Sequence, residues 1–487
     1  MTGQRVDNLT NELRHGRISR RTFMKRAFAL GLSVTSVAAL LEACTPASTP
    51  TPIPAPTTPP AGTPTLAATP TPLPAPKLPE NLNILLFSHD AEIQQKKGPA
   101  FEEENGIKLA FETVVADDSR DKILSAHRAG SSSWDTLPLW ATVVMEMADR
   151  GWLMDLTPYL EETLFKVTDD LVEGDSIFTA VTFKGKIYAV PDKVGGPILQ
   201  WNKEILEKRG LDPERPAGWH KTPYSIDEFL EWAQECTFEE GGVQYWGFAD
   251  QWGEQVAGTF HTLIQMYGGN TFDMTKNEPY GEPTMNSEEG VTALQWMVDL
   301  LHKHKCIDPA SLTYDWVFDF TPSYLGGRTA FIITWPFVTH VAQDPEQSAI
   351  VDKNGFAPNF AAETSATVEG TEFQAISAYA PHGPDAAWLW LEHMSSYDMM
   401  KLQGLESGWA PIYKSQLNDP AITEAMFEGP VVAQSLDYPH QGYFTPDATQ
   451  WDEIFRGEIH AALRQEKSPQ EALDDAVEAI KAMRAST

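Results

Sequence analysis

Residues 45–76 constrain the fold most, because they consist almost wholly of Pro, Thr, Ala and Ser and contain no charged residue. A segment of this composition cannot bury apolar surface, and it favours an extended, largely polyproline II conformation. A globular part can therefore begin only near Leu78, which leaves roughly 410 of the 487 residues. A single hydrophobic core stops growing at about 250–300 residues, so we expect the remainder to form two lobes.

The residues before this segment have the pattern of an export signal. Residues 19–25 (SRRTFMK) match the twin-arginine pattern, and the apolar run 27–41 follows. This run is shorter than the roughly 20 apolar residues that a membrane-spanning helix needs, so it is typical of a signal peptide. It ends at residues 41–44 (LEAC), which resemble a lipoprotein signal-peptidase site.

These patterns predict how the chain is divided before its globular part. Residues 1–43 are expected to be a twin-arginine lipoprotein signal peptide, and Cys44 is expected to carry the lipid. Residues 44–78 then form a disordered tether that holds the globular part at the outer face of the cytoplasmic membrane.

Charge and cysteine content narrow the possible partners. The formal net charge is −32, from 36 basic and 68 acidic residues, and a surface so negative repels nucleic acid and anionic lipid headgroups. Besides Cys44 the chain has only Cys236 and Cys306. These two could pair outside the cytoplasm or remain buried thiols, and folding before twin-arginine export favours the thiols.

The globular part begins with the rhythm of an α/β lobe. Strands are expected at residues 83–87, 107–111 and 136–140, with helices between them, which is typical of a mostly parallel sheet. The second half contains more helices, and Ser225 and Ser287 are expected to cap two of them because acidic residues follow each serine.

Motifs of catalysis and of cofactor binding are largely absent. The chain has no GxGxxG after a strand, no GxxxxGK[ST], no HExxH and no GxSxG. His302, His304 and Cys306 stand two residues apart, so they do not share one face of a helix and are expected to be structural. The sequence thus predicts no catalytic residue, cofactor or metal, although two catalytic carboxylates could be hidden among the 68 acidic residues.

Several tryptophans stand beside helix breakers or polar residues, outside periodic apolar faces. They include Trp140, Trp252, Trp335 and Trp409. An aromatic ring can stack on the apolar face of a sugar while polar side chains bind its hydroxyl groups. For any one tryptophan, packing in the core is the simpler interpretation, and the residues alone leave both roles open.

Five segments, in chain order, carry a resemblance to a known family. They are residues 100–108, residues 134–157 with GWLMDLT at 151–157, residues 188–206 with YAVP at 188–191 and WNKEIL at 201–206, residues 320–331 with GGRTA at 326–330, and GWAP at 408–411. Together they resemble the family 1 extracellular solute-binding proteins of ATP-binding-cassette importers, which are of the maltose-binding-protein type. The similarity covers essentially the whole globular part.

The resemblance implies a two-lobed, periplasmic-binding-protein-like α/β fold of type II. Each lobe is then a mixed sheet flanked by helices, and the ligand binds in the cleft between the lobes. Both lobes are discontinuous in such proteins. The first is expected to comprise residues 79–195 and 355–396, and the second residues 196–354 and 397–487.

The resemblance also implies ligand-binding residues in both lobes. The first lobe is expected to contribute His89, Asp90, Trp140 and Asp192. The second is expected to contribute Trp252, Trp335, Trp409 and Trp451.

The implied function is capture of a neutral solute, most simply a sugar or oligosaccharide, by a lipid-anchored monomer that delivers it to a membrane permease. Two alternatives remain open from the sequence. One is a surface-anchored polysaccharide hydrolase, and the other is a sensory binding protein that feeds no transport.

Overall fold

The computed structural model describes residues 78–162, 170–172, 174–440 and 442–486. The expected signal peptide, Cys44 and nearly all of the expected tether lie outside these residues. Within them, no helix has both the length and the apolar content that crossing a membrane requires.

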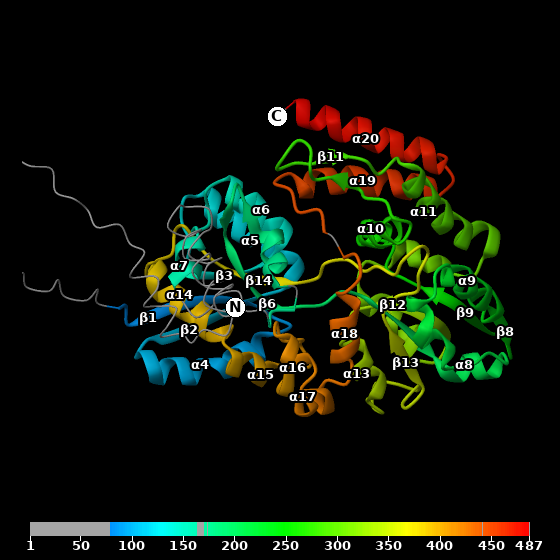
Figure 1. The fold of residues 1–487 in the computed structure, drawn as a ribbon, viewed down its shortest axis with the longest axis horizontal. Helices are drawn as coiled ribbons and strands as arrows, with labels where there is room; N and C mark the ends of the chain where they lie inside the picture. Colours follow the sequence, from blue (N-terminus) through cyan, green and yellow to red (C-terminus); the bar gives the residue numbers. More distant parts are fainter. Residues whose placement is uncertain (1–77, 163–169, 173, 441, 487) are drawn as a thin grey trace, which may run out of the picture. The chain divides into compact units, whose positions relative to one another are not determined.

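The first lobe is built on a five-stranded mixed sheet (Figure 1). The strands in spatial order are β2 (Lys108–Val114), β1 (Asn81–Phe87), β3 (Thr136–Trp140), β14 (Glu372–Ile376) and β6 (Ala189–Lys193). β1 runs parallel to β2 and β3, whereas β14 is antiparallel to β3 and β6. The helices of this lobe are α4 (Ala91–Asn105), α5 (Ala116–Arg128), α6 (Ala141–Asp149), α7 (Thr157–Glu162), α14 (Pro384–Met394), α15 (Tyr397–Glu406), α16 (Lys414–Leu417), α17 (Pro420–Ala425) and α18 (Gly429–Ser435).

The second lobe has its own five-stranded mixed sheet. The spatial order is β13 (Asn354–Ala357), β7 (Ile198–Asn202), β12 (Thr329–Thr334), β9 (Val243–Ala249) and β8 (Phe238–Glu240). β12 and β9 are parallel, and the other neighbouring pairs are antiparallel. Its helices are α8 (Lys203–Lys208), α9 (Ser225–Glu235), α10 (Val256–Met266), α11 (Glu288–Asp299), α12 (Val317–Leu325), α13 (Val338–Gln343), α19 (Ala448–Leu463) and α20 (Pro469–Ala485).

Short elements complete the fold. The strands β4 (Thr182–Phe183) and β5 (Lys186–Ile187) form one small hairpin, and β10 (Phe272–Asp273) and β11 (Glu282–Pro283) form another. The helical turns are η1 (Gly174–Val181), η2 (Arg215–Lys221), η3 (Leu300–His304) and η4 (Pro309–Thr313). α19 and α20 pack on each other and against α10 and α11, which Figure 1 shows at the C-terminal end.

The two hydrophobic cores define lobe boundaries that differ from the expected ones. β13 pairs with β7, and Phe360 and Ala366 lie in the second core, so the first lobe resumes only at β14 and not at residue 355. Residues of the segment 400–436 pack in the first core, including Met400, Ile412, Ile422, Met426 and Val432. The second lobe therefore regains the chain after α18, whereas the sequence placed this return at residue 397.

Cys236 and Cys306 are free thiols buried in the second core. Burial raises the pKa of each thiol to about 12, so neither carries the thiolate character that a reactive cysteine needs.

Candidate functional site

Polar and aromatic side chains gather at one edge of the first sheet. β1 ends at Phe87 and is followed by His89 and Asp90, β3 ends at Trp140, and β6 ends at Lys193. β14 runs the other way and begins at this edge, where Glu372 pairs with both Trp140 and Lys193. In α/β sheets, ligands bind beside the carboxyl ends of the strands, so this edge is the first lobe's candidate binding surface.

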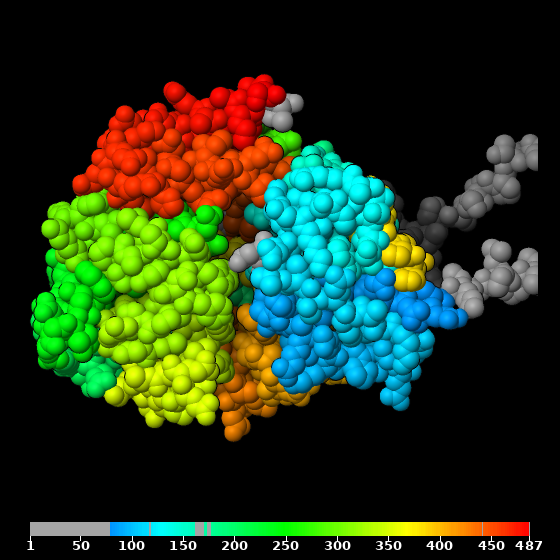
Figure 2. Space-filling model, turned by 180° about the vertical axis from the view of Figure 1, so that it is seen from behind, coloured from blue at the N-terminus to red at the C-terminus, as the bar shows by residue number. Residues whose placement is uncertain are grey.

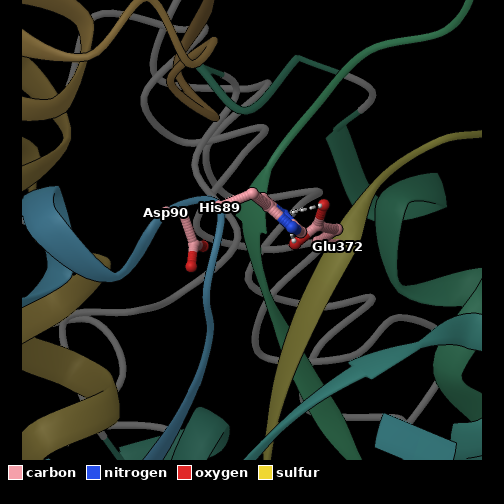
Figure 3. A group of neighbouring side chains, drawn as sticks. All are labelled: His89, Asp90 and Glu372. Atoms are coloured by element: carbon pink, nitrogen blue, oxygen red, sulfur yellow. Dashed lines mark hydrogen bonds and ion pairs between the residues drawn. The ribbon is translucent and has the colours of Figure 1, made fainter. Parts of the chain in front are cut away.

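A buried ion network forms the floor of this edge. The Lys193 ammonium lies 2.6 Å from Asp90 Oδ2 and 2.7 Å from Glu372 Oε2, and 4% or less of the Lys193 and Asp90 side chains is exposed. The His89 ring nitrogen Nε2 lies 3.1 Å from Glu372 Oε1, as Figure 3 shows. Although burial opposes the charge on Lys193, the attraction of Asp90 and Glu372 raises its pKa above the ordinary value.

His89, Asp90 and Glu372 lie close enough together to hold a metal ion, but a lysine ammonium lies beside them. One ligand atom each from His89, Asp90 and Glu372 lies within 4.8 Å of the others. However, the Lys193 ammonium already bonds both carboxylates, and it would repel a cation placed among them. We therefore assign a structural ion network here and no metal.

Asp192 is buried beside this surface. It is 1% exposed, and both of its carboxylate oxygens accept hydrogen bonds from Gln94 Nε2 at 2.9 Å. Lys97 Nζ, which is fully buried, lies 3.9 Å from Asp192 Oδ1. Burial lowers the pKa of Lys97 to about 8, and Asp192 opposes that shift. The expected ligand contact of Asp192 is thus corrected to a structural role.

Two of the expected tryptophans do lie partly exposed at this edge. The Lys193 ammonium lies 4.9 Å from the centre of the Trp409 ring. The centre of the His89 ring lies 5.5 Å from that of Trp409. The Phe87 ring stacks between His89 and Trp140, with centroid distances of 5.3 and 5.2 Å. Trp140 and Trp409 are half-buried, so each still presents aromatic surface. Trp409 therefore lies at the edge of the first sheet, whereas it was expected to contribute from the second lobe.

The second lobe contributes a hollow beside the ends of β9 and β12. Its volume is about 580 Å³, counting the space that opens to solvent. Figure 2 shows a groove between the blue and cyan residues of the first lobe and the green residues of the second. The described side chains of the hollow are aromatic, aliphatic or neutral and polar, apart from one carboxylate. They include Asp250, Gln251, Thr259, Trp296 and Trp335.

Three buried polar atoms of these lining residues have no hydrogen-bond partner. They are Nε1 of Trp296, Nε1 of Trp335 and Oε1 of Gln251. Buried polar groups are normally hydrogen-bonded, so these three atoms are free to bond a molecule that enters the hollow. The hollow thus offers two donors and one acceptor, all uncharged.

Among the described residues that line this hollow, Asp250 is the only ionisable group, and protein donors already occupy its oxygens. Oδ1 accepts from the Gln251 N–H at 2.8 Å, and Oδ2 accepts from Trp252 Nε1 at 2.9 Å and from Thr259 Oγ1 at 2.8 Å. Burial raises the pKa of Asp250 to about 6, against the effect of these hydrogen bonds. Within the part of the chain that the structure describes, no lysine, arginine or histidine lines the hollow.

Trp252 and Trp451 are core residues, which corrects the expectation that they contact ligand. Trp252 is 0% exposed and bonds Asp250, and Trp451 is 3% exposed and donates to Thr445 Oγ1 at 2.8 Å. Sequence reasoning missed Gln251 and Trp296. The polar residues that follow β9 are a sequence signal for Gln251, although Trp252 beside it is the aromatic residue that the pattern favours. Nothing in the sequence pattern separated Trp296 from the apolar residues of its helix.

Comparisons with known proteins agree with this architecture. Residues 88–401 match the family of bacterial extracellular solute-binding proteins. A probable amino-acid ABC transporter periplasmic-binding protein of Sinorhizobium fredii is 24% identical over 389 residues, covering 77% of this chain and 82% of the relative. An erythritol/L-threitol-binding protein of Mycolicibacterium smegmatis is 23% identical over 380 residues, covering 73% of this chain and 71% of the relative.

The fold has a close counterpart among solved structures. Maltose-bound MalE3 of T. maritima superposes with a TM-score of 0.70 at 24% identity, and the match covers 83% of this chain and 99% of MalE3. The matched family consists of solute-binding proteins and not of enzymes. The family match spans more than half of the sequence, and the chain therefore belongs to the bacterial extracellular solute-binding protein family.

Proposed function

We propose that this protein captures a small, uncharged sugar or polyol and delivers it to the permease of an ATP-binding-cassette importer. The observation that carries the proposal is the set of three orphaned, uncharged groups at the hollow of the second lobe, on Gln251, Trp296 and Trp335. A hydroxyl group both donates and accepts a hydrogen bond, so a polyhydroxylated ligand can satisfy all three.

The charges of the site favour this ligand class over an amino acid. An amino acid needs a cation for its carboxylate and an anion for its ammonium group. Lys193, the buried cation at the edge of the first sheet, is bonded to Asp90 and Glu372, and the oxygens of Asp250 are occupied. The S. fredii relative is described as a probable amino-acid binder. Among the described residues that line the hollow, the only charged side chain is Asp250, and its oxygens already have protein donors.

The ligand class is tested by a thermal-shift series on the purified protein with erythritol, D-mannitol, maltose, L-leucine and L-glutamate. A ligand that binds only the folded state raises the melting temperature, by an amount that grows with its concentration. We expect a rise with at least one sugar or polyol and none with either amino acid. A rise with an amino acid alone would contradict the proposal.

Export and anchoring form the second part of the proposal. The twin-arginine pattern at residues 19–25 and the LEAC sequence at 41–44 support a lipoprotein at the outer face of the cytoplasmic membrane. Replacing Arg20 and Arg21 by lysine should stop export, because the arginine pair is the element that the translocase reads. Mature protein outside the cytoplasm in the double variant would contradict this assignment.

A further inference from the structure

Two of the chain segments that connect the lobes run side by side. We call residues 194–197 and 367–371 the hinge pair, because any rotation of one lobe against the other must bend them. The Gly370 N–H donates to the Gly195 carbonyl at 3.0 Å, and Thr367 Oγ1 donates to the Pro197 carbonyl at 2.8 Å.

Gly370 lies where no side chain fits. A Cβ atom at this position would stand 2.3 Å from Cζ3 and 2.5 Å from Cη2 of Trp335, and 2.8 Å from the Gly195 carbonyl oxygen. The backbone of Gly370 is not in the left-handed region, so other residues could adopt its conformation. The glycine is therefore required by the indole ring that lies on it.

Trp335 also borders the hollow. It follows β12, lines the hollow, and has a buried Nε1 without a partner. Its carbonyl accepts a 3.4 Å hydrogen bond from Gln200 Nε2. Gln200 lies on β7, the strand that follows residues 194–197 of the hinge pair. One rigid ring thus contacts both the space offered to a ligand and the backbone that must bend.

We infer that Gly370 is a positioning residue that seats Trp335 between the hinge pair and the hollow, so that a ligand held by Trp335 fixes the hinge. The inference rests on the proposed function only in taking Trp335 as a ligand contact. Packed interiors transmit displacements because they contain little free volume. A shift of the indole therefore moves the hinge pair, and a movement of the hinge pair shifts the indole.

The coupling is tested first without ligand, by hydrogen exchange on the full-length protein. We expect Gly370→Ala to speed exchange in the peptide that contains Trp335, and Trp335→Leu to speed exchange in the peptide that contains Gly370. Trp335→Leu opens space and creates no clash, so it supplies the reciprocal measurement if Gly370→Ala folds poorly. The control is Gly218→Ala, because a Cβ atom at Gly218 meets nothing within 4 Å. Unchanged exchange in both distant peptides would overturn the inference.

The second test uses D-mannitol as the probe. Gly370→Ala should weaken D-mannitol binding by at least about tenfold, since overpacking a well-packed site displaces its side chains. In the Trp335→Leu background, Gly370→Ala should weaken D-mannitol binding by less than about threefold, because the effects of substitutions at two residues in contact are not additive. Equal losses in both backgrounds would overturn the inference. Should wild-type protein bind no sugar or polyol, the proposed function fails, while the exchange experiment still decides the coupling.

Discussion

Lys193 and Glu372 face each other across the antiparallel pair of β6 and β14, and the ammonium lies 2.7 Å from the carboxylate with 4% and 7% of the two side chains exposed. Buried charges are tolerated when each finds an opposite charge and hydrogen bonds. Here one ammonium balances two carboxylates, because Asp90 bonds the same nitrogen. The network fixes the ends of β1, β6 and β14 relative to one another, beneath the aromatic surface of Trp409.

Lys193→Met should destabilise the fold strongly. The change leaves Asp90 and Glu372 buried without their cation, and breaking a buried pair in this way costs about 3–5 kcal/mol. Urea unfolding at neutral pH measures the loss. The control is Lys353→Met, whose pair with Glu204 is exposed (42% and 58%) and should contribute about 1 kcal/mol or less. Equal effects of the two changes would refute a special role for Lys193.

The regular start of the first lobe could be predicted from the sequence. The strand expected at residues 136–140 is β3, and the strand expected at 83–87 lies within β1, because buried strands between turn residues give a local signal. Ser287 caps α11 as predicted, through a hydrogen bond from the Gly290 N–H. Ser225 does not cap α9, because its hydroxyl donates to the Trp219 and Ala361 carbonyls and Tyr224 precedes the helix in the left-handed conformation.

The parts that could not be predicted depend on contacts between distant segments. The short helices α15 to α18 carry apolar residues that would suit either core, and only the folded chain shows that Met400 and Ile412 belong to the first. Trp252 and Trp335 both follow strands of the second sheet, yet one is sealed in the core and the other lines the hollow. The direction of a side chain after a strand ends is set by tertiary packing, which a local pattern does not encode.

Cys44→Ala should release the protein from the membrane. All acyl chains of the expected anchor are attached at Cys44, so the variant lacks every one of them. Stable anchoring needs more than one acyl chain. Membrane and soluble fractions of cells that express the variant give the measurement. Full retention of a variant whose signal peptide has been removed would show that another anchor exists.

Asp250 should make stability depend on pH in an unusual direction. Burial raises its pKa in the folded state from 3.8 to about 6, so the folded protein binds this proton more tightly than the unfolded chain does. Its contribution to stability is therefore fully present below about pH 4 and is lost as the pH rises through 6. Asp250→Asn removes the titration, so the unfolding free energy of wild type minus variant should fall by up to about 3 kcal/mol from pH 4 to pH 7.

Asp273 supplies the opposite case as a control for this experiment. Hydrogen bonds from Lys276 and Thr275 lower its pKa to about 2, so its contribution to stability is present above pH 4 and is lost as the pH falls through 2. Asp273→Asn should therefore give a difference curve of the opposite slope at low pH. A difference curve for Asp250→Asn that is flat from pH 4 to pH 7 would contradict the raised pKa.

Replacement of four tryptophans by alanine should separate the binding surface from the core. Trp335 lines the hollow and Trp409 is half-exposed above Lys193, so each variant should weaken binding of the best sugar or polyol by about 1–3 kcal/mol. Trp252 and Trp451 are buried in the second core, so their variants should lower the unfolding free energy by about 3–5 kcal/mol and leave the affinity of the folded fraction little changed. Titration and urea unfolding on all four variants measure both quantities. If Trp335→Ala and Trp409→Ala lost stability while keeping wild-type affinity, the hollow and the aromatic edge would not be the place where the solute binds.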